Sequence, residues 1–121
     1  MKYALLLYAD EASWDGLDPE AQGEVMAQHE AATGAMQAAG AHVGGEALSP
    51  TDTAMTLRLR DGKPLVTDGP FIEAKEALGG FYLVECASMD EALEWAARLP
   101  EAGTGAVEVR PLIDFEAEAA E

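Results

Sequence analysis

The sequence has few of the residues on which many functional classes depend. Among its 121 residues there is one cysteine, Cys86, so no disulfide can form within the chain. A single thiol fits a reducing environment, and we expect a cytoplasmic protein. The two histidines, His29 and His42, do not form a zinc-type spacing with that cysteine. We therefore expect no bound metal.

Basic residues and long apolar segments are also scarce. The chain has 7 Lys and Arg residues against 23 Asp and Glu residues, which gives a formal net charge of −16. Such a charge repels phosphate backbones and anionic lipids, which argues against direct binding to nucleic acid or to a membrane surface. No run approaches the ~18 apolar residues of a membrane span, and no signal peptide is expected at the start of the chain. There is no glycine-rich phosphate loop, and we expect no cofactor.

The residues that are present follow the pattern of a small α+β domain. Hydrophobic periodicity and turn residues predict the following elements: strands at 2–9, 41–48, 53–60, 64–67, 78–86 and 105–112, and helices at 19–39 and 89–99. Residues 10–17 read as a loop. The chain is expected to fold as one domain over residues 1–113, followed by an acidic solvated tail at 114–121.

The first expected helix has a clear start and a clear inward face. Asp18 is placed to cap it and Pro19 to occupy its first turn, and Gly40 is placed to stop it. Five residues repeat at spacings of three and four and are expected to face the core: Val25, His29, Ala32, Met36 and Ala39. The second helix is predicted to begin with a capping box, Ser88 to Glu91, and to end before Pro100.

Without the hairpin at 53–67, the order of elements is βαββαβ, the ferredoxin-like split arrangement. Right-handed crossovers place both helices on one face of the sheet. The strands at 2–9 and 78–86 are nevertheless apolar on both faces, and an exposed apolar sheet is a liability in a monomer. We therefore expect a homodimer in which two sheets pack face to face and form an α+β barrel.

A long central motif resembles a known family. Residues 66–82 read VTDGPFIEAKEALGGFY and are similar to the DGPF signature, close to DGPFAETKEQLGGFY, of proteins in the YCII-related family. Ile72 stands where that signature has Ala, and Ala74 where it has Thr. The opening MKYALLLYADEASW, the GGEAL at 44–48 and the EALEWAARLP at 91–100 are similar as well, so the resemblance extends to about Leu112.

The resemblance implies a dimeric α+β barrel of ferredoxin-like topology and a family whose biochemical function is mostly unassigned. It also implies an acid–base pair in a cleft, which maps onto His29 and Asp68. Relatives of this type are linked to sigma-factor regulation through gene context, although the charge of −16 argues against contact with DNA.

The residues themselves leave two roles open for each member of this pair. His29 either moves a proton, because imidazole exchanges protons near neutral pH, or is a histidine satisfied by one hydrogen bond in a groove. Asp68 precedes Gly69-Pro70 and either caps its own turn or orients the imidazole of His29. Gly79-Gly80 fits a bulge at the start of a strand better than a ligand site.

Five further residues are candidates for binding a small molecule. Four aromatic residues and one arginine are expected near the same strand ends: Tyr8, Trp14, Phe71, Tyr82 and Arg58. The aromatic rings fit either a pocket wall or packing at a barrel mouth or dimer interface. Arg58 fits either a substrate carboxylate or an ordinary ion pair.

These observations leave two hypotheses from different functional classes. In the first, the protein is a small cofactor-free enzyme that uses His29 and Asp68 as an acid–base pair on a small organic molecule. In the second, it is a non-catalytic module that binds a metabolite or a protein partner and serves regulation. The sequence does not decide between them.

Overall fold

A four-stranded antiparallel sheet forms the centre of the computed structural model, which describes residues 1–116. Its strands are β1 (Lys2–Ala9), β2 (His42–Ala47), β5 (Ala77–Glu85) and β6 (Ala106–Pro111). Their order across the sheet is β2-β5-β1-β6, so the first strand of the chain lies inside the sheet. This mixed α+β topology is consistent with the ferredoxin-like arrangement predicted from the order of elements.

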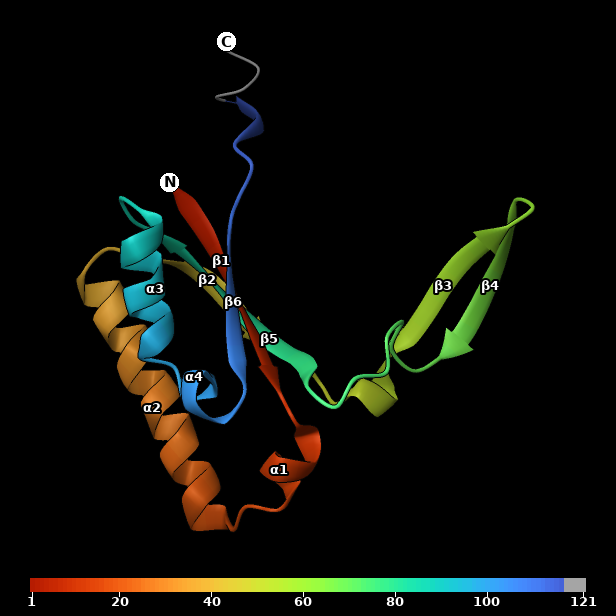
Figure 1. Ribbon diagram of the computed structural model, residues 1–121, viewed down its shortest axis with the longest axis horizontal. Helices are drawn as coiled ribbons and strands as arrows, with labels where there is room; N and C mark the ends of the chain where they lie inside the picture. The colour runs from red at the N-terminus through yellow and green to blue at the C-terminus, as the bar shows by residue number, and fades with distance from the viewer. Residues whose placement is uncertain (117–121) are drawn as a thin grey trace.

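The two main helices, α2 (Pro19–Ala38) and α3 (Met89–Ala97), lie on the same side of this sheet (Figure 1). Both begin where the sequence predicted. The side chain of Asp18 accepts a hydrogen bond from the backbone N–H of Ala21 at 2.8 Å, and Ser88 accepts one from Glu91 at 3.2 Å. These bonds satisfy N–H groups that have no partner within the first turn of a helix.

The hydrophobic core lies between these helices and the sheet. Its most deeply buried side chains are Leu5, Met36 and Val84. The predicted inward stripe of α2 is confirmed at Ala32 and Met36, which are both buried, and is wrong at Ala39, which is exposed. Ala39 is the C-cap of α2, where the chain has already begun to turn away from the core toward β2.

Three short helical segments were not predicted. Residues 10–17, expected as a loop, contain α1 (Glu11–Asp15), and η1 (Thr51–Thr53) follows β2. The two segments are joined, because the carboxylate of Glu11 accepts hydrogen bonds from the backbone N–H and the hydroxyl of Thr51 at 2.8 and 2.9 Å. This contact spans 40 residues of sequence and is therefore invisible to local patterns.

The third short helix, α4 (Glu101–Thr104), lies between α3 and β6. The sequence predicted one helix up to residue 99, but α3 ends at Ala97, and the chain turns again directly after Pro100. A proline is favoured at the start of a helix because its fixed φ angle suits the first turn.

The predicted hairpin is present as a separate two-stranded sheet of β3 (Met55–Arg60) and β4 (Lys63–Asp68). Its turn residues, Asp61 and Gly62, have φ angles of 52° and 76°, the combination that a two-residue hairpin turn of type I′ requires. This hairpin arm, residues 55–68, extends away from the helices and the central sheet (Figure 1).

Two further predictions concern the acidic C-terminal tail and the absence of a membrane-spanning helix. Residues 114–116, the described part of the predicted acidic tail, are exposed, and residues 117–121 lie outside the described residues. Within residues 1–116, no helix is long and apolar enough to cross a membrane.

Candidate functional site

A cavity of about 380 Å³ opens between α2 and strands β2 and β5. Its walls are largely apolar, with residues such as Leu7 and Met26. The polar residues that line it are His29, Thr33, His42, Glu46, Tyr82 and Glu101, of which Glu46 pairs with Phe81 and has its side chain on the other face of the sheet. A cavity of this size, with mostly apolar walls and a few polar groups, is typical of a small-molecule site.

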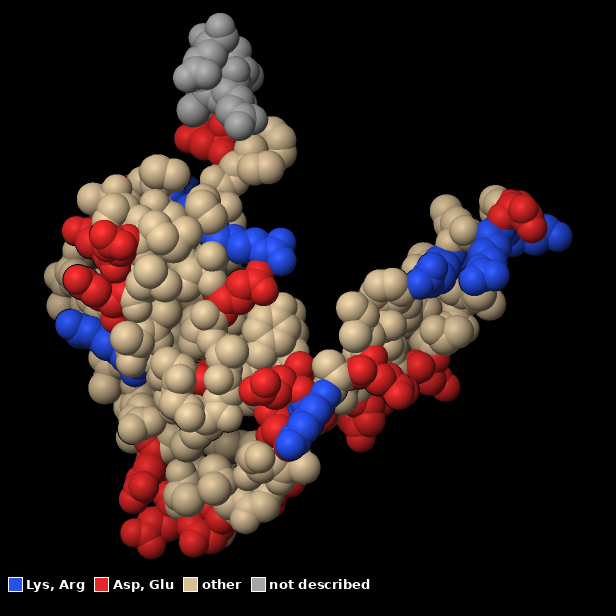
Figure 2. Space-filling view, in the orientation of Figure 1, with Lys and Arg blue, Asp and Glu red and all other residues tan. Residues whose placement is uncertain are grey.

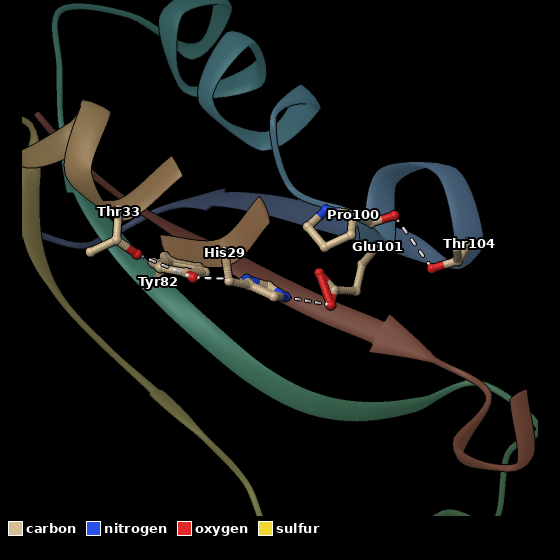
Figure 3. Close-up of polar contacts among 6 residues, drawn as sticks. All are labelled: His29, Thr33, Tyr82, Pro100, Glu101 and Thr104. Carbon is tan, nitrogen blue, oxygen red and sulfur yellow. Dashed lines mark hydrogen bonds and ion pairs between the residues drawn. The ribbon is translucent and has the colours of Figure 1, made fainter. Parts of the chain in front are cut away.

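His29 lies at the centre of a hydrogen-bonded chain in this wall (Figure 3). Its Nδ1 atom is 2.8 Å from the hydroxyl oxygen of Tyr82 on β5, and its Nε2 atom is 2.9 Å from Oε2 of Glu101 on α4. The side chains of His29 and Glu101 are only 17% and 15% exposed. Three elements that are distant in sequence therefore converge on one imidazole ring.

The chemistry of the two partners assigns the tautomer of His29. An ionised carboxylate only accepts hydrogen bonds, so Nε2 carries the proton that is donated to Glu101. In the neutral ring Nδ1 is then the acceptor, and the phenol of Tyr82 donates to it. The carboxylate, imidazole and hydroxyl are hydrogen-bonded in the same order as in a Ser-His-Asp catalytic triad, with tyrosine in the place of serine.

Within residues 1–116, two hydrogen-bond acceptors of the Tyr82–His29–Glu101 chain receive no hydrogen bond: one lone pair of the Tyr82 oxygen and Oε1 of Glu101. The Tyr82 oxygen receives a hydrogen bond from the hydroxyl of Thr33 at 3.4 Å, which leaves it one further lone pair. Oε1 of Glu101 is buried and has no hydrogen-bond partner among the described residues. A buried acceptor without a partner is costly in a folded protein.

Gly79 and Gly80 shape the floor of the cavity. The pairing between β1 and β5 shifts at this point, with Leu7 opposite Gly80 and Tyr8 opposite Leu78, so Gly79 is the extra residue of a bulge, as predicted. At Gly80 a Cβ atom would lie only 2.9 Å from the backbone oxygen of Glu46 on β2. Both glycines also line the cavity.

Only Gly80 lacks room for a Cβ atom, so alanine substitutions at the two neighbouring glycines give a matched stability test. We expect Gly80→Ala to lower the free energy of unfolding by about 1–3 kcal/mol, because β2 and β5 must move apart. Gly79→Ala is the control, because its Cβ would meet nothing within 4 Å, and we expect a change within about 0.5 kcal/mol. Urea unfolding of the two variants measures both values, and equal destabilisation would contradict this packing.

The structure brings together only part of the predicted site. Tyr82 is the one predicted binding residue that lines the cavity, and it contacts His29 directly. Asp68 lies at the base of the hairpin arm, away from α2 (Figure 1), so within one chain the carboxylate beside His29 is Glu101 and not Asp68.

The other predicted binding residues lie outside the cavity walls. Arg58 and Phe71 contact each other, with the guanidinium carbon 4.5 Å from the ring centre. Trp14 lies on α1, and Tyr8 lies near the end of β1. None of these four lines the cavity within residues 1–116.

Sequence reasoning missed Glu101 and Thr33. Thr33 follows His29 by four residues on α2, a spacing that places two side chains on the same face of a helix, so it could have been found. Pro100-Glu101 carries a weaker signal, since proline and an acid are both favoured at a helix start. Nothing local pairs Glu101 with a histidine 72 residues earlier.

Two comparisons with known proteins bear on this site. Residues 1–116 match the model of the YCII-related domain. The chain is also 45% identical over 114 residues to an uncharacterized protein of Rhizobium meliloti (strain 1021), an alignment that covers 93% of this chain and 92% of that protein. A family match over this length and a relative at this identity lead to one conclusion: the chain belongs to the YCII-related family.

Proposed function

We propose that the protein is a cofactor-free acid–base enzyme that moves a proton on a small cyclic organic molecule held in the cavity. The observation that carries this proposal is the position of His29, with both ring nitrogens engaged by titratable side chains at the cavity wall. Compared with the sequence-based hypothesis of a His29–Asp68 pair, Glu101 takes the role of the carboxylate within one chain, and Tyr82 faces the substrate.

The hydrogen bonds indicate how the proton moves. The Tyr82 oxygen accepts a proton from a weakly acidic C–H group while its own hydroxyl proton passes to Nδ1 of His29. The electron pair of the broken C–H bond becomes the enolate of the substrate. The imidazolium that forms is stabilised by the carboxylate of Glu101, and the reverse steps return a proton to the same carbon or a conjugated one.

The same geometry explains why Tyr82 is the group that would touch the substrate. Both nitrogens of His29 are occupied by Tyr82 and Glu101, so the ring cannot reach a substrate atom without losing a bond. The Tyr82 oxygen keeps one lone pair, and Thr33 fixes its position. His29 and Glu101 are therefore positioning residues in this proposal.

Hydrogen–deuterium exchange at carbon tests the proposal without knowledge of the natural substrate. We expect the protein in D2O to accelerate deuterium incorporation next to the carbonyl of cyclohexanone or cyclohex-3-enone, followed by proton NMR. We expect Tyr82→Phe to slow the catalysed exchange by about 100- to 10,000-fold, since it removes the proton carrier and keeps the ring.

Two outcomes would count against this reading. Equal exchange rates for the wild type and Tyr82→Phe would contradict the role of Tyr82. Saturable binding of these ketones without any exchange would favour the second hypothesis, a ligand-binding or regulatory module. Fluorescence or NMR titration of the same compounds separates binding from turnover.

We also propose that the working unit is a homodimer with an α+β barrel between two sheets. Leu6 and Leu83 alternate with the core-facing residues of β1 and β5 and remain partly exposed, which supports a second sheet packed on that face. In this arrangement a catalytic role for Asp68 requires the hairpin arm of the other copy.

Two further assignments rest on the sequence. The motif from Asp68 to Phe71 supports placing the chain in the DGPF subgroup of its family. The single cysteine supports a cytoplasmic location.

A further inference from the structure

We infer that the acidic C-terminal segment of a second copy, residues 114–121, docks on the basic face of the hairpin arm. This basic face is formed by Arg58 and Arg60 on β3 and by Lys63 on β4. The contact lies outside the cavity and does not depend on the proposed enzyme activity. It assigns a partner of stated chemistry to a surface that the fold of one chain leaves open.

The strand pairing places the three basic side chains on one face of the arm. Arg60 lies directly opposite Lys63, and Arg58 lies two residues before Arg60, so all three project to the same side. Leu57 and Val66 pair between these positions and project from the other face. Figure 2 shows the basic side chains gathered on the outer part of the arm. The arm therefore has a basic face and an apolar face.

The basic face is unfavourable without an anionic partner. Arg60 and Lys63 are opposite each other on a two-stranded ribbon, where like charges repel. The ion pairs within residues 1–116 lie outside the arm, so no carboxylate of these residues neutralises the three cations. Arg58 instead lies over the ring of Phe71, at 4.5 Å from its centre. In a chain with a formal net charge of −16, such a cluster indicates that an anionic group binds there.

The C-terminal segment has the charge that this face requires. Residues 114–121 read DFEAEAAE and contain four acidic residues and no basic one. Residues 112–116 are exposed and extend beyond the end of β6 (Figure 1). A segment that extends from the domain can reach the face of a ribbon without a collision between two folded bodies. Opposite charges then favour the encounter and select this partner.

The sheet places the arm and the C-terminal segment at opposite ends of one chain. Strand β6 ends at Pro111, which lies next to Tyr3 near the start of β1. The chain returns from the arm into β5 at Ala77, which lies opposite Ala9 at the end of β1. Residues 112–116 therefore lead away from the base of their own arm, and we assign the contact to a second copy. In a two-fold pair, each copy supplies one arm and one segment.

Carbodiimide cross-linking of the full chain tests this contact, because it joins a lysine amine to a neighbouring carboxylate. Equal amounts of nitrogen-14 and nitrogen-15 labelled protein are unfolded in urea, refolded together and cross-linked, and the products are identified by mass spectrometry. We expect Lys63 to be joined to residues 114–121 in pairs that carry one isotope on each peptide. Lys75 is an exposed lysine outside the basic face, and we expect its yield with the same segment to be at least about fivefold lower.

Two double variants locate the contact. Arg58→Gln with Arg60→Gln keeps Lys63 as the reporter and is expected to lower its cross-link to the segment by about fivefold. Lys75→Gln with Arg98→Gln is the matched control, because it removes an equal charge from outside the arm, and we expect less than about a twofold change. Yields are normalised to the acetylation rate of Lys63 in each variant, which corrects for changes in amine reactivity. Equal losses in both variants would overturn the inference.

Three results with the wild-type chain would also overturn it. Cross-links from Lys63 to carboxylates of the main body in place of the segment would identify a different partner. Pairs of a single isotope would place the segment on its own arm. If Lys63 forms no cross-link to residues 114–121, the basic face does not hold this segment. A dimer in light scattering without this cross-link would leave the proposed homodimer standing, and none of these results bears on the deuterium exchange.

Discussion

If the hairpin arm also packs on the second copy in the proposed homodimer, replacing Leu57 by lysine is expected to convert that dimer into monomers. One face of the hairpin arm carries apolar side chains that are all exposed: Met55, Leu57, Leu59 and Val66. Leu57 lies in the middle of this face, opposite Val66, and is 61% exposed. A second copy that buried this face would have to desolvate the new ammonium group, so we expect dimer affinity to fall by about 100-fold or more.

The charge on the arm favours another copy of this chain as its partner. Arg58, Arg60 and Lys63, three of the seven basic residues, lie on the arm, and acidic side chains form several patches on the visible face of the main body (Figure 2). By the β3–β4 pairing these basic side chains project from the face opposite Leu57, so their attraction to an acidic body would favour encounter between copies rather than the burial of Leu57 itself.

A lysine on the opposite face of the arm provides the control. Thr67 pairs with Thr56, one position away from the Leu57–Val66 pair, and therefore projects from the other face. We expect Thr67→Lys to leave the dimer intact, as measured by light scattering after gel filtration at micromolar concentration. A monomeric wild type, or equal effects of both lysines, would contradict the proposed assembly.

His29→Gln is expected to slow the catalysed deuterium exchange by about 100-fold, because no base remains to take the proton of Tyr82. Glutamine keeps hydrogen-bonding atoms of similar reach, so we expect a smaller effect on folding than on exchange. A large loss of exchange with little change in thermal stability is the expected pattern. If His29 had only a structural role, its replacement would instead lower thermal stability and exchange together.

A double variant tests whether His29 and Tyr82 act as one unit. If the proton passes along a single chain, His29→Gln combined with Tyr82→Phe is no slower than the slower of the two single variants. Multiplicative losses would show that the residues act independently, which the hydrogen bond of 2.8 Å between them does not predict.

Local sequence signals predicted the elements whose causes are local. Asp18 and Ser88 identified both main helix starts because capping depends on residues within one turn. Asp61-Gly62 identified the hairpin because the turn needs residues that tolerate positive φ angles. The α1 segment was missed although Asp10 caps it locally, accepting a hydrogen bond from the backbone N–H of Ala12 at 3.0 Å; the contact between Glu11 and Thr51 across 40 residues was not visible to local patterns.

For the candidate site, too, the sequence predicted some residues and missed others. His29 and Tyr82 were both named from the sequence, but their contact spans 53 residues and needed the fold to become visible. Asp68 was chosen as the carboxylate partner of His29 because it lies in a conspicuous motif. The acid that contacts His29 within the chain is Glu101, which follows Pro100 in a segment where no helix was expected.

The most direct test of the central claim is the nitrogen-15 NMR spectrum of the His29 ring. The His42→Gln variant leaves one histidine in the chain, so every ring nitrogen signal of that variant belongs to His29. We predict a protonated Nε2 and an unprotonated Nδ1 whose signal moves when Tyr82 is replaced by phenylalanine. A proton on Nδ1, or an Nδ1 signal that ignores Tyr82→Phe, would contradict the Tyr82–His29–Glu101 chain.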